Sequence, residues 1–503
     1  MALKSPLGFG MMRLPVKSSD PTDFDYEQLK QMVDTFLAAG YNYFDTSYVY
    51  HNGKSEEATR KAVVERHPRG SFTVATKFPT FILKAEDEIE PIFAQQLENL
   101  GVEYIDYYLL HNIQTVYYDG VDGTGGVVKT CHLFDHALKW KEDGKIKHLG
   151  FSFHSSAKLL DRILTEHPEM EFVQIPLNYI DWESELVQAK QCYEVIRKHG
   201  RQVIIMEPVK GGGLSLVPPA VETALREMDP NAGAASWAIR FAGSLDGVLC
   251  TLSGMSTLEQ VQDNIRTIRQ LEPLTEAERA KLHEIVKIYR DAGPVGADLS
   301  KYEGLKYHGV PVTAILEAYN ICQLQPDPGF SDDNNYLKNA VAEEAHLDIF
   351  GMLPEEKVIL ADGTDAAELV RKAEQWLIKH SEAGSFFELF FRKTAPFHYA
   401  SIEMTGFSRS VQLRLHLEKA ENHYRKFYPG SHFRHRFLIK PVSFRVRKVP
   451  QLGQAPVFKI SRKYRAGLLG TSSFLFWIFY TAWAMKLPIL WAASFCIFPV
   501  TWV

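Results

Sequence analysis

Cysteines are few in this sequence, and none of them stands at the spacing of a metal site or a redox pair. The five are Cys131, Cys192, Cys250, Cys322 and Cys496, with no C-x-x-C among them. Isolated thiols of this kind are typical of proteins from a reducing compartment. We therefore expect thiols that form no disulfide, and we expect no bound metal.

Two further signals are missing near the N-terminus. Residues 1–15, MALKSPLGFGMMRLP, contain no long apolar run, so we expect no secretory signal and a cytoplasmic location for the acidic part of the chain. No G-x-G-x-x-G follows the first apolar run. This absence argues against an open, doubly wound dinucleotide-binding sheet.

Acidic residues are scarce in the last quarter of the chain. Residues 381–503 carry 18 Lys and Arg against 5 Asp and Glu, a net charge of +13, whereas residues 1–380 carry 38 against 56, a net charge of −18. Residues 466–485, AGLLGTSSFLFWIFYTAWAM, contain no charge at all. Such asymmetry indicates that the two parts meet different surroundings.

Eight short apolar runs recur through the first 255 residues. They are residues 6–14, 41–47, 72–77, 104–111, 146–153, 172–178, 202–208 and 247–254. Stretches of helical periodicity separate them, the clearest being the first, with Leu29, Met32, Val33 and Phe36 on one face. Eight strands alternating with helices predict an α/β fold, a (β/α)8 TIM barrel with buried parallel strands.

Composition divides the chain into four predicted parts. Residues 1–290 would form the barrel, and residues 291–380 a C-terminal helical extension packed on it. Residues 381–465 form a basic segment rich in aromatic residues. Residues 466–503 form a hydrophobic tail, in which the uncharged run 466–485 has the length of a transmembrane segment.

Polar residues stand at the ends of the second, third and fourth predicted strands. They are Asp45 with Tyr50 in the following loop, Lys77, and His111. Each alone also fits a structural role, such as a turn cap or a core histidine, but a barrel brings strand ends together at one mouth. There Asp45 would hold Lys77, Lys77 would lower the pKa of the Tyr50 phenol, and a neutral His111 would bind a substrate oxygen.

Several segments resemble the aldo-keto reductases over roughly residues 6–290. They are FDTSYVYHNGKSE, VATKFP, YIDYYLLHN, HLGFSFH, VQIPLNY and LSGMSTLEQVQDNI. The resemblance implies a TIM barrel, an NADP or NAD cofactor and a catalytic tetrad of Asp45, Tyr50, Lys77 and His111. Tyr50 would be the general acid in direct hydride transfer between the nicotinamide and an aldehyde, a ketone or the alcohol.

The same resemblance implies a set of cofactor-binding residues. Ser152 and Gln174 would bind the carboxamide, although Phe153 stands where an asparagine is common, and Asp263 and Asn264 would contact adenine. Independently of the resemblance, the glycines of EPVKGGGLS can bring backbone amides close to a phosphate, and the turn after the eighth strand leads into a helix N-terminus. The predicted phosphate residues are Gly211, Gly212, Ser253 and Gly254.

The preference between the two cofactors stays open. In relatives that prefer NADP(H), a lysine and an arginine hold the 2′-phosphate, and this chain has Gly254 and Gln260 at those positions. Lys210 and Arg266 are candidates to replace that charge. Long bacterial relatives also carry a cysteine-rich ferredoxin-like tail, but here no cysteine precedes Cys322, so we expect no iron–sulfur cluster.

The substrate itself cannot be predicted from the sequence beyond a small-molecule carbonyl. The candidate substrate loop is residues 112–131, and Tyr117, Tyr118, Trp182 and Phe78 are candidate pocket residues.

Three interpretations of residues 381–503 compete: a membrane anchor through residues 466–503, a nucleic-acid-binding segment, and an appended segment without function. Nucleic acid is the least favoured partner because no recognisable module frames the basic residues. The leading hypothesis for the whole chain is a carbonyl-reducing enzyme. The alternatives are a reductase-like, nicotinamide-sensing subunit of a membrane partner, and a purely structural barrel.

Overall fold

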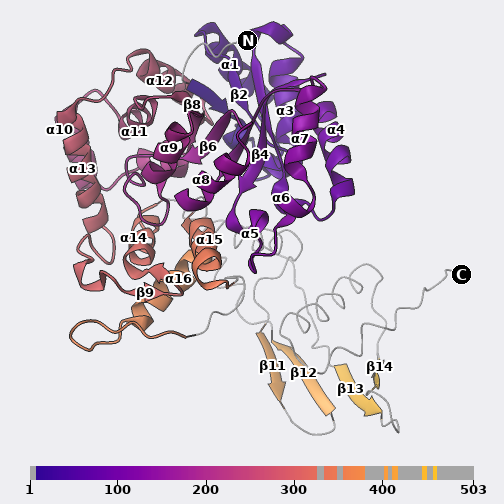
Figure 1. The fold of residues 1–503 in the computed structure, drawn as a ribbon, viewed down its shortest axis with the longest axis vertical. Coiled ribbons are helices and arrows are strands. Elements are labelled where there is room, and N and C mark those ends of the chain that lie inside the picture. Colours follow the sequence, from indigo (N-terminus) through magenta and orange to yellow (C-terminus); the bar gives the residue numbers. More distant parts are fainter. Residues whose placement is uncertain are drawn as a thin grey trace, which may run out of the picture. The chain divides into compact units, whose positions relative to one another are not determined.

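The computed structural model describes residues 7–325, 333–347 and 355–379, together with four strands between residues 401 and 461. The chain divides into two compact units, Met1–Phe387 and Glu388–Val503. The first unit contains a barrel and the helices that follow it (Figure 1).

Eight parallel strands close into the barrel, each paired with the next and β8 paired with β1. Their bounds are β1 (Leu7–Gly10), β2 (Tyr43–Asp45), β3 (Thr73–Phe78), β4 (Ile105–Ile113), β5 (Ile146–Phe153), β6 (Phe172–Pro176), β7 (Gln202–Met206) and β8 (Val248–Gly254). All eight predicted runs contain a strand, so the predicted TIM barrel is confirmed.

The strands are apolar on both faces because both faces are buried. Inside the barrel, side chains from six strands form one cluster: Tyr43, Ala75, Tyr107, Leu109, Phe172, Ile204, Cys250 and Leu252. The alternate side chains, such as Val74 and Phe78 of β3, pack in the larger cluster beneath the helices. The two-residue period of a strand thus sends neighbours such as Lys77 and Phe78 to opposite layers.

Helices connect successive strands and cover the barrel. They are α1 (Tyr26–Ala38), α2 (Tyr50–Gly53), α3 (Ser55–Thr59), α4 (Ile89–Leu100), α5 (Thr115–Tyr118), α6 (Val127–Thr130), α7 (Leu133–Glu142), α8 (Ala157–Glu166), α9 (Ala189–Lys198), α10 (Pro219–Met228), α11 (Ala234–Gly243), α12 (Leu258–Arg269) and α13 (Glu276–Asp291). Several begin at a side-chain cap, as when Asp25 accepts from the Gln28 amide. Helix α9 begins at Ala189, after a series of turns that follows β6.

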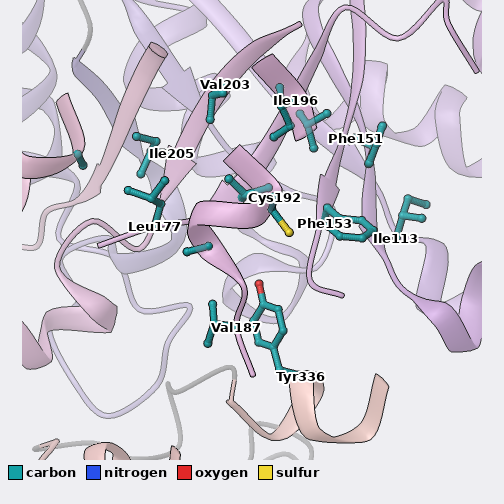
Figure 2. Packing of buried hydrophobic residues seen from close by; sticks show 14 of the residues in the cluster. Ile113, Phe151, Phe153, Leu177, Val187, Cys192, Ile196, Val203, Ile205 and Tyr336 are labelled. Atoms are coloured by element: carbon teal, nitrogen blue, oxygen red, sulfur yellow. The ribbon is translucent and has the colours of Figure 1, made fainter. Parts of the chain in front are cut away.

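Three helices follow the barrel: α14 (Val312–Cys322), α15 (Asp333–Ala345) and α16 (Ala367–Lys379), preceded by the hairpin strands β9 (Lys306–Tyr307) and β10 (Val310–Pro311). They gather at one end of the barrel (Figure 1). Tyr336 of α15 belongs to the main core cluster, and Figure 2 shows it beside Val187 and Cys192. The described helices of residues 291–380 are therefore packed into the core that the barrel helices form.

The second unit contains a four-stranded antiparallel sheet within the basic segment. Its strands are β11 (Ser401–Thr405), β12 (Ser410–His416), β13 (Phe444–Val449) and β14 (Val457–Ser461), in that order. Strand β13 pairs antiparallel with β12 on one side and with β14 on the other.

The hydrophobic tail predicted over residues 466–503 lies outside the described residues. Within the part of the chain that the structure describes, no helix combines the length and the apolar character needed to cross a bilayer. The four cysteines in that part, Cys131, Cys192, Cys250 and Cys322, are buried free thiols, as expected.

Gly150 of β5 offers a direct test of the barrel packing. A Cβ at this position would overlap the backbone oxygen of Phe172 on β6 and lie 2.8 Å from its ring. We expect Gly150→Ala to lower the free energy of unfolding by about 1–3 kcal/mol through overpacking. Gly70→Ala is the control because a Cβ there meets nothing within 4 Å. Equal stability of the two variants in denaturant titrations would contradict this packing.

Candidate active site

A buried lysine links two strand ends at the mouth of the barrel. Lys77, near the end of β3, is completely buried, and its Nζ donates to the carboxylate of Asp45 at the end of β2. The same nitrogen donates to the Thr46 carbonyl at 2.8 Å and to Tyr50 Oη at 3.2 Å. Three of the four predicted tetrad residues thus share one hydrogen-bonded cluster.

Burial and charge shift the pKa values of Lys77 and Asp45 in opposite directions. Burial lowers the pKa of Lys77, but the charge and hydrogen bonds of Asp45 and Tyr50 outweigh it, so the net pKa is raised. Burial raises the pKa of Asp45, and the Lys77 charge offsets part of this rise. The ammonium therefore stays charged at neutral pH, directly beside the Tyr50 hydroxyl.

His111 of β4 is the fourth residue of the predicted tetrad, and its imidazole is neutral. Its ring centroid lies 6.0 Å from that of Tyr50, and its Nδ1 shares a 3.2 Å hydrogen bond with Ser47 Oγ. Burial, and then the charges of Lys77 and His154, hold the pKa of His111 well below its usual value. A neutral ring with its hydrogen on Nε2 leaves Nδ1 to accept from Ser47 and Nε2 to donate into the site.

Hydrogen bonds of the His51 ring hold the loop that follows Tyr50. The backbone of His51 is left-handed, with φ of 51°. The Leu14 amide donates to His51 Nε2 at 3.2 Å, so the ring hydrogen lies on Nδ1, which is 2.7 Å from the Pro21 carbonyl oxygen. Burial lowers the pKa of His51 and favours this neutral form. The ring thereby holds the Tyr50 loop against the segment that follows β1.

Two predicted carboxamide ligands lie on adjacent strands, where Ser152 of β5 is in register with Gln174 of β6. Ser152 Oγ accepts from the Asn112 amide at 2.7 Å. Gln174 is only 1% exposed, and its Oε1 has no hydrogen-bond partner among the described residues. An unsatisfied buried acceptor costs free energy, so this oxygen fits the amide N–H₂ of a bound nicotinamide.

The predicted phosphate residues follow β7 and β8. Gly211 and Gly212, both with positive φ, lie in the short helical turn Lys210–Ser215. Lys210 is buried there and donates to both carboxylate oxygens of Asp181, at 2.8 and 2.9 Å. This ion pair already neutralises the Lys210 charge, and the interpretation of Lys210 as a phosphate ligand stays a prediction.

At the end of β8, Gly254 is exposed while Ser253 is buried and accepts from Asn264 Nδ2 at 2.7 Å. The other charge candidate, Arg266, forms an ion pair with its neighbour Asp263 on α12. Arg13 is a cation that the sequence reasoning missed: a Cβ on Gly254 would lie 3.0 Å from its Cδ. Arg13 follows β1 in the sequence, and β1 pairs with β8 in the closed barrel. This order could have indicated that Arg13 lies near Gly254.

Two of the predicted pocket residues face away from the mouth. Phe78 packs in the helix layer, 6.2 Å from the Trp140 ring, and Tyr118 is buried with its hydroxyl 2.5 Å from Glu166. Tyr117 and Trp182 are half-buried. Phe81, which was not predicted, lies 5.4 Å from the His111 ring and is 36% exposed.

The extension reaches the loops that follow β5 and β6. Asn339 Nδ2 of α15 donates to the His154 carbonyl at 2.9 Å, and Ser156 Oγ donates to Glu343 at 2.7 Å. Thr313 of α14 donates to Glu185 at 2.8 Å. His154 itself is buried, and burial together with the Lys77 charge lowers its pKa to about 3. These contacts place α14 and α15 at the carboxyl ends of the strands.

Comparison with known proteins identifies relatives of the barrel. The family model described as Aldo/keto reductase family matches residues 6–287, more than half of the chain. An aldo-keto reductase from Mycolicibacterium vanbaalenii is 30% identical over 257 residues, 50% of this chain and 82% of that protein. A probable aldo-keto reductase 1 from Glycine max is 29% identical over 216 residues, 41% of this chain and 57% of that protein.

Among solved structures, the holo form of an aldo-keto reductase from Bacillus halodurans is similar to this chain, with 23% identity and a TM-score of 0.45. The similarity covers 57% of this chain and 95% of that one.

The buried pair predicts a specific pattern of stability. Lys77→Met leaves the Asp45 carboxylate buried without its counter-ion, so we expect a loss of about 3–5 kcal/mol in the free energy of unfolding. Adding Asp45→Asn to this variant removes the uncompensated carboxylate charge and should recover most of that loss. Denaturant titrations of both variants measure this, and a double variant that is less stable than Lys77→Met would contradict a direct pair.

Proposed function

The chain belongs to the aldo/keto reductase family, which makes it an NAD(P)-dependent oxidoreductase, and we propose that it reduces an aldehyde or ketone with Tyr50 as the proton donor. Oxidation of the corresponding alcohol is the reverse of this reaction. The observation that carries the proposal is the hydrogen bond between Lys77 Nζ and Tyr50 Oη beside the buried Asp45 carboxylate.

Proton transfer is the part of the reaction that this chain's side chains perform. A phenol keeps its proton at neutral pH because its ordinary pKa is roughly 10. The adjacent Lys77 ammonium stabilises the phenolate that forms when Tyr50 gives its proton to the substrate oxygen. Asp45 keeps Lys77 charged and oriented, and neutral His111 binds the same oxygen without competing as a proton donor.

A bound nicotinamide supplies the hydride that reaches the carbonyl carbon. The residues proposed to bind its carboxamide are Ser152 and Gln174. Support comes from the buried Gln174 Oε1, for which the described part of the chain offers no hydrogen-bond partner. For the phosphates we propose the backbone of Gly211 and Gly212 and the β8 end at Ser253 and Gly254. For adenine we propose Asp263 and Asn264 on α12. The choice between NADP and NAD depends on the charge near Gly254, where Arg13 is the neighbouring cation.

Helices α14 and α15 of the extension are proposed to form one wall of the substrate site. Support comes from the hydrogen bonds of α14 and α15 to the loops after β5 and β6, and from Tyr336 in the common core. His154, whose ring centroid lies 6.1 Å from that of Tyr336, connects this wall to the cluster around Lys77.

Replacing Tyr50 tests the proposed acid. Tyr50→Phe removes one hydroxyl, and we expect kcat for carbonyl reduction to fall about 10²–10⁴-fold while the Kd of NADPH or NADH changes little. Steady-state kinetics on a panel of aldehydes and ketones, with cofactor titration by fluorescence quenching of the full chain, measures both quantities.

The matched control is Tyr48→Phe, the same chemical change two residues earlier, which should retain activity. Unchanged turnover in Tyr50→Phe would exclude Tyr50 as the acid. Tight cofactor binding by the unaltered protein without turnover of any carbonyl would instead favour the nicotinamide-sensing alternative.

Replacing Asn339 tests the proposed wall. Asn339→Ala removes the hydrogen bond from α15 to the His154 carbonyl, so we expect KM for the carbonyl to rise about three- to tenfold, as for loss of about one hydrogen bond. The Kd of the cofactor should stay the same. The control is Arg371→Ala on α16, which removes only an exposed ion pair to Glu355. Equal effects of the two substitutions on KM would contradict a specific role of α15.

A further inference from the structure

A second buried carboxylate lies behind the lysine, on the helix side of β3. Glu56 of α3 is completely buried and accepts three side-chain hydrogen bonds. Thr76 Oγ1 and Gln96 Nε2 donate to its Oε1 at 2.7 and 2.9 Å, and Asn99 Nδ2 donates to its Oε2 at 2.9 Å. None of the residues proposed above for catalysis or cofactor binding belongs to this network.

The network is joined directly to the backbone of Lys77. Gln96 Nε2 also donates to the Lys77 carbonyl at 3.0 Å, and Thr76 is the residue before Lys77 in β3. Tyr108 of β4 donates to Gln96 Oε1 at 2.5 Å, which fixes the orientation of that amide. The end of β3 is therefore held from the helix side, while the Lys77 side chain lies on the barrel side.

The helix that carries Glu56 also supports the other side of Lys77. Ser55 Oγ accepts from Thr46 Oγ1 at 2.8 Å and donates to the Met11 carbonyl at 3.0 Å. The Thr46 carbonyl is one of the acceptors of Lys77 Nζ. One short helix thus orients both the strand that bears the lysine and a group that receives its hydrogen bond.

The donors around Glu56 favour its ionised form. Thr76, Gln96 and Asn99 all give hydrogens to its oxygens, and a carboxylate is an acceptor only. Burial raises the pKa of Glu56, while these hydrogen bonds and the charge of Lys77 lower it, with a net rise. The titratable groups facing Glu56 are Lys77 on β3 and Tyr108 on β4.

We propose that Glu56 is a positioning residue for the reaction: its carboxylate holds the end of β3 and, as a second negative charge beside Lys77, raises the pH at which Tyr50 loses its proton. This inference rests on the proposed function, because it acts on Tyr50 as the acid. On the barrel side, Asp45, His111 and His154 face Lys77, and only Asp45 among them carries a negative charge.

Glu56→Gln is the test, because it removes the charge and keeps the size and one acceptor oxygen. Reduction needs Tyr50 protonated, so activity is lost as pH rises through the Tyr50 pKa. Without the Glu56 charge the phenolate is less disfavoured, and the high-pH limb of kcat should move down by about one pH unit. We also expect kcat at its optimum to fall about tenfold, with KM changed less than twofold.

Two control variants distinguish the effect of the Glu56 charge from the effect of its hydrogen bonds. Glu56→Asp keeps the charge with altered hydrogen bonds, so its kcat should fall but its high-pH limb should remain that of the unaltered protein. Glu374→Gln makes the same change at a buried carboxylate of α16, which pairs with His308 at 3.0 Å, and should leave the pH profile unchanged. A high-pH limb that stays in place in Glu56→Gln, or that moves equally in Glu374→Gln, would overturn the proposal.

Asn99→Ala provides a second route if Glu56→Gln does not fold. Losing one of three donors raises the Glu56 pKa, so the low-pH limb of kcat should move to higher pH, and an unmoved limb would overturn the proposal. Tyr50→Phe distinguishes a failure of the proposed function from a failure of the proposed role of Glu56. If that variant remains active, the proposed function fails; if it is inactive while Glu56→Gln has the unaltered profile, only the role of Glu56 fails.

Discussion

The ion pair between Lys77 and Asp45 is the interaction on which the mouth of the barrel depends. Both groups are buried, and removing a charge from water costs several kcal/mol unless a partner and further hydrogen bonds compensate. The Thr46 carbonyl and the Tyr50 hydroxyl supply those bonds, so the ends of β2 and β3 and the start of α2 must keep one relative position. Folding thereby places a charged donor beside the phenol before any substrate arrives.

Strand β3 separates two polar environments with different roles. On the barrel side, Lys77 meets Asp45, Tyr50 and the neutral His111, where proton transfer is proposed. On the helix side, Thr76 donates to the buried carboxylate of Glu56, which belongs to a separate hydrogen-bond network. Because a strand is nearly rigid between its two faces, an arrangement held on the helix side also determines where the lysine lies on the barrel side.

The barrel and much of the candidate site could be predicted from the sequence. Eight apolar runs between helical stretches led to the closed sheet, and the polar residues at strand ends led to Asp45, Tyr50, Lys77 and His111. The prediction of Phe78 as a pocket residue was wrong, because Phe78 packs beneath the helices while its neighbour Lys77 faces inward. Nothing in the sequence indicated that Lys210 pairs with Asp181, which lies 29 positions earlier in the chain.

The order of strands and helices, and the residues that stand at each strand end, could be predicted from the sequence alone. These are local properties, set by hydrophobic period and by the residues that begin and end each element. The tertiary structure was needed to show which face each buried side chain takes, because strands that are apolar on both sides have no alternation of polar and apolar residues. It alone also joined Glu56 to Gln96 and Asn99, and α15 to His154, since hydrogen bonds between distant segments depend on how the elements pack rather than on any local pattern.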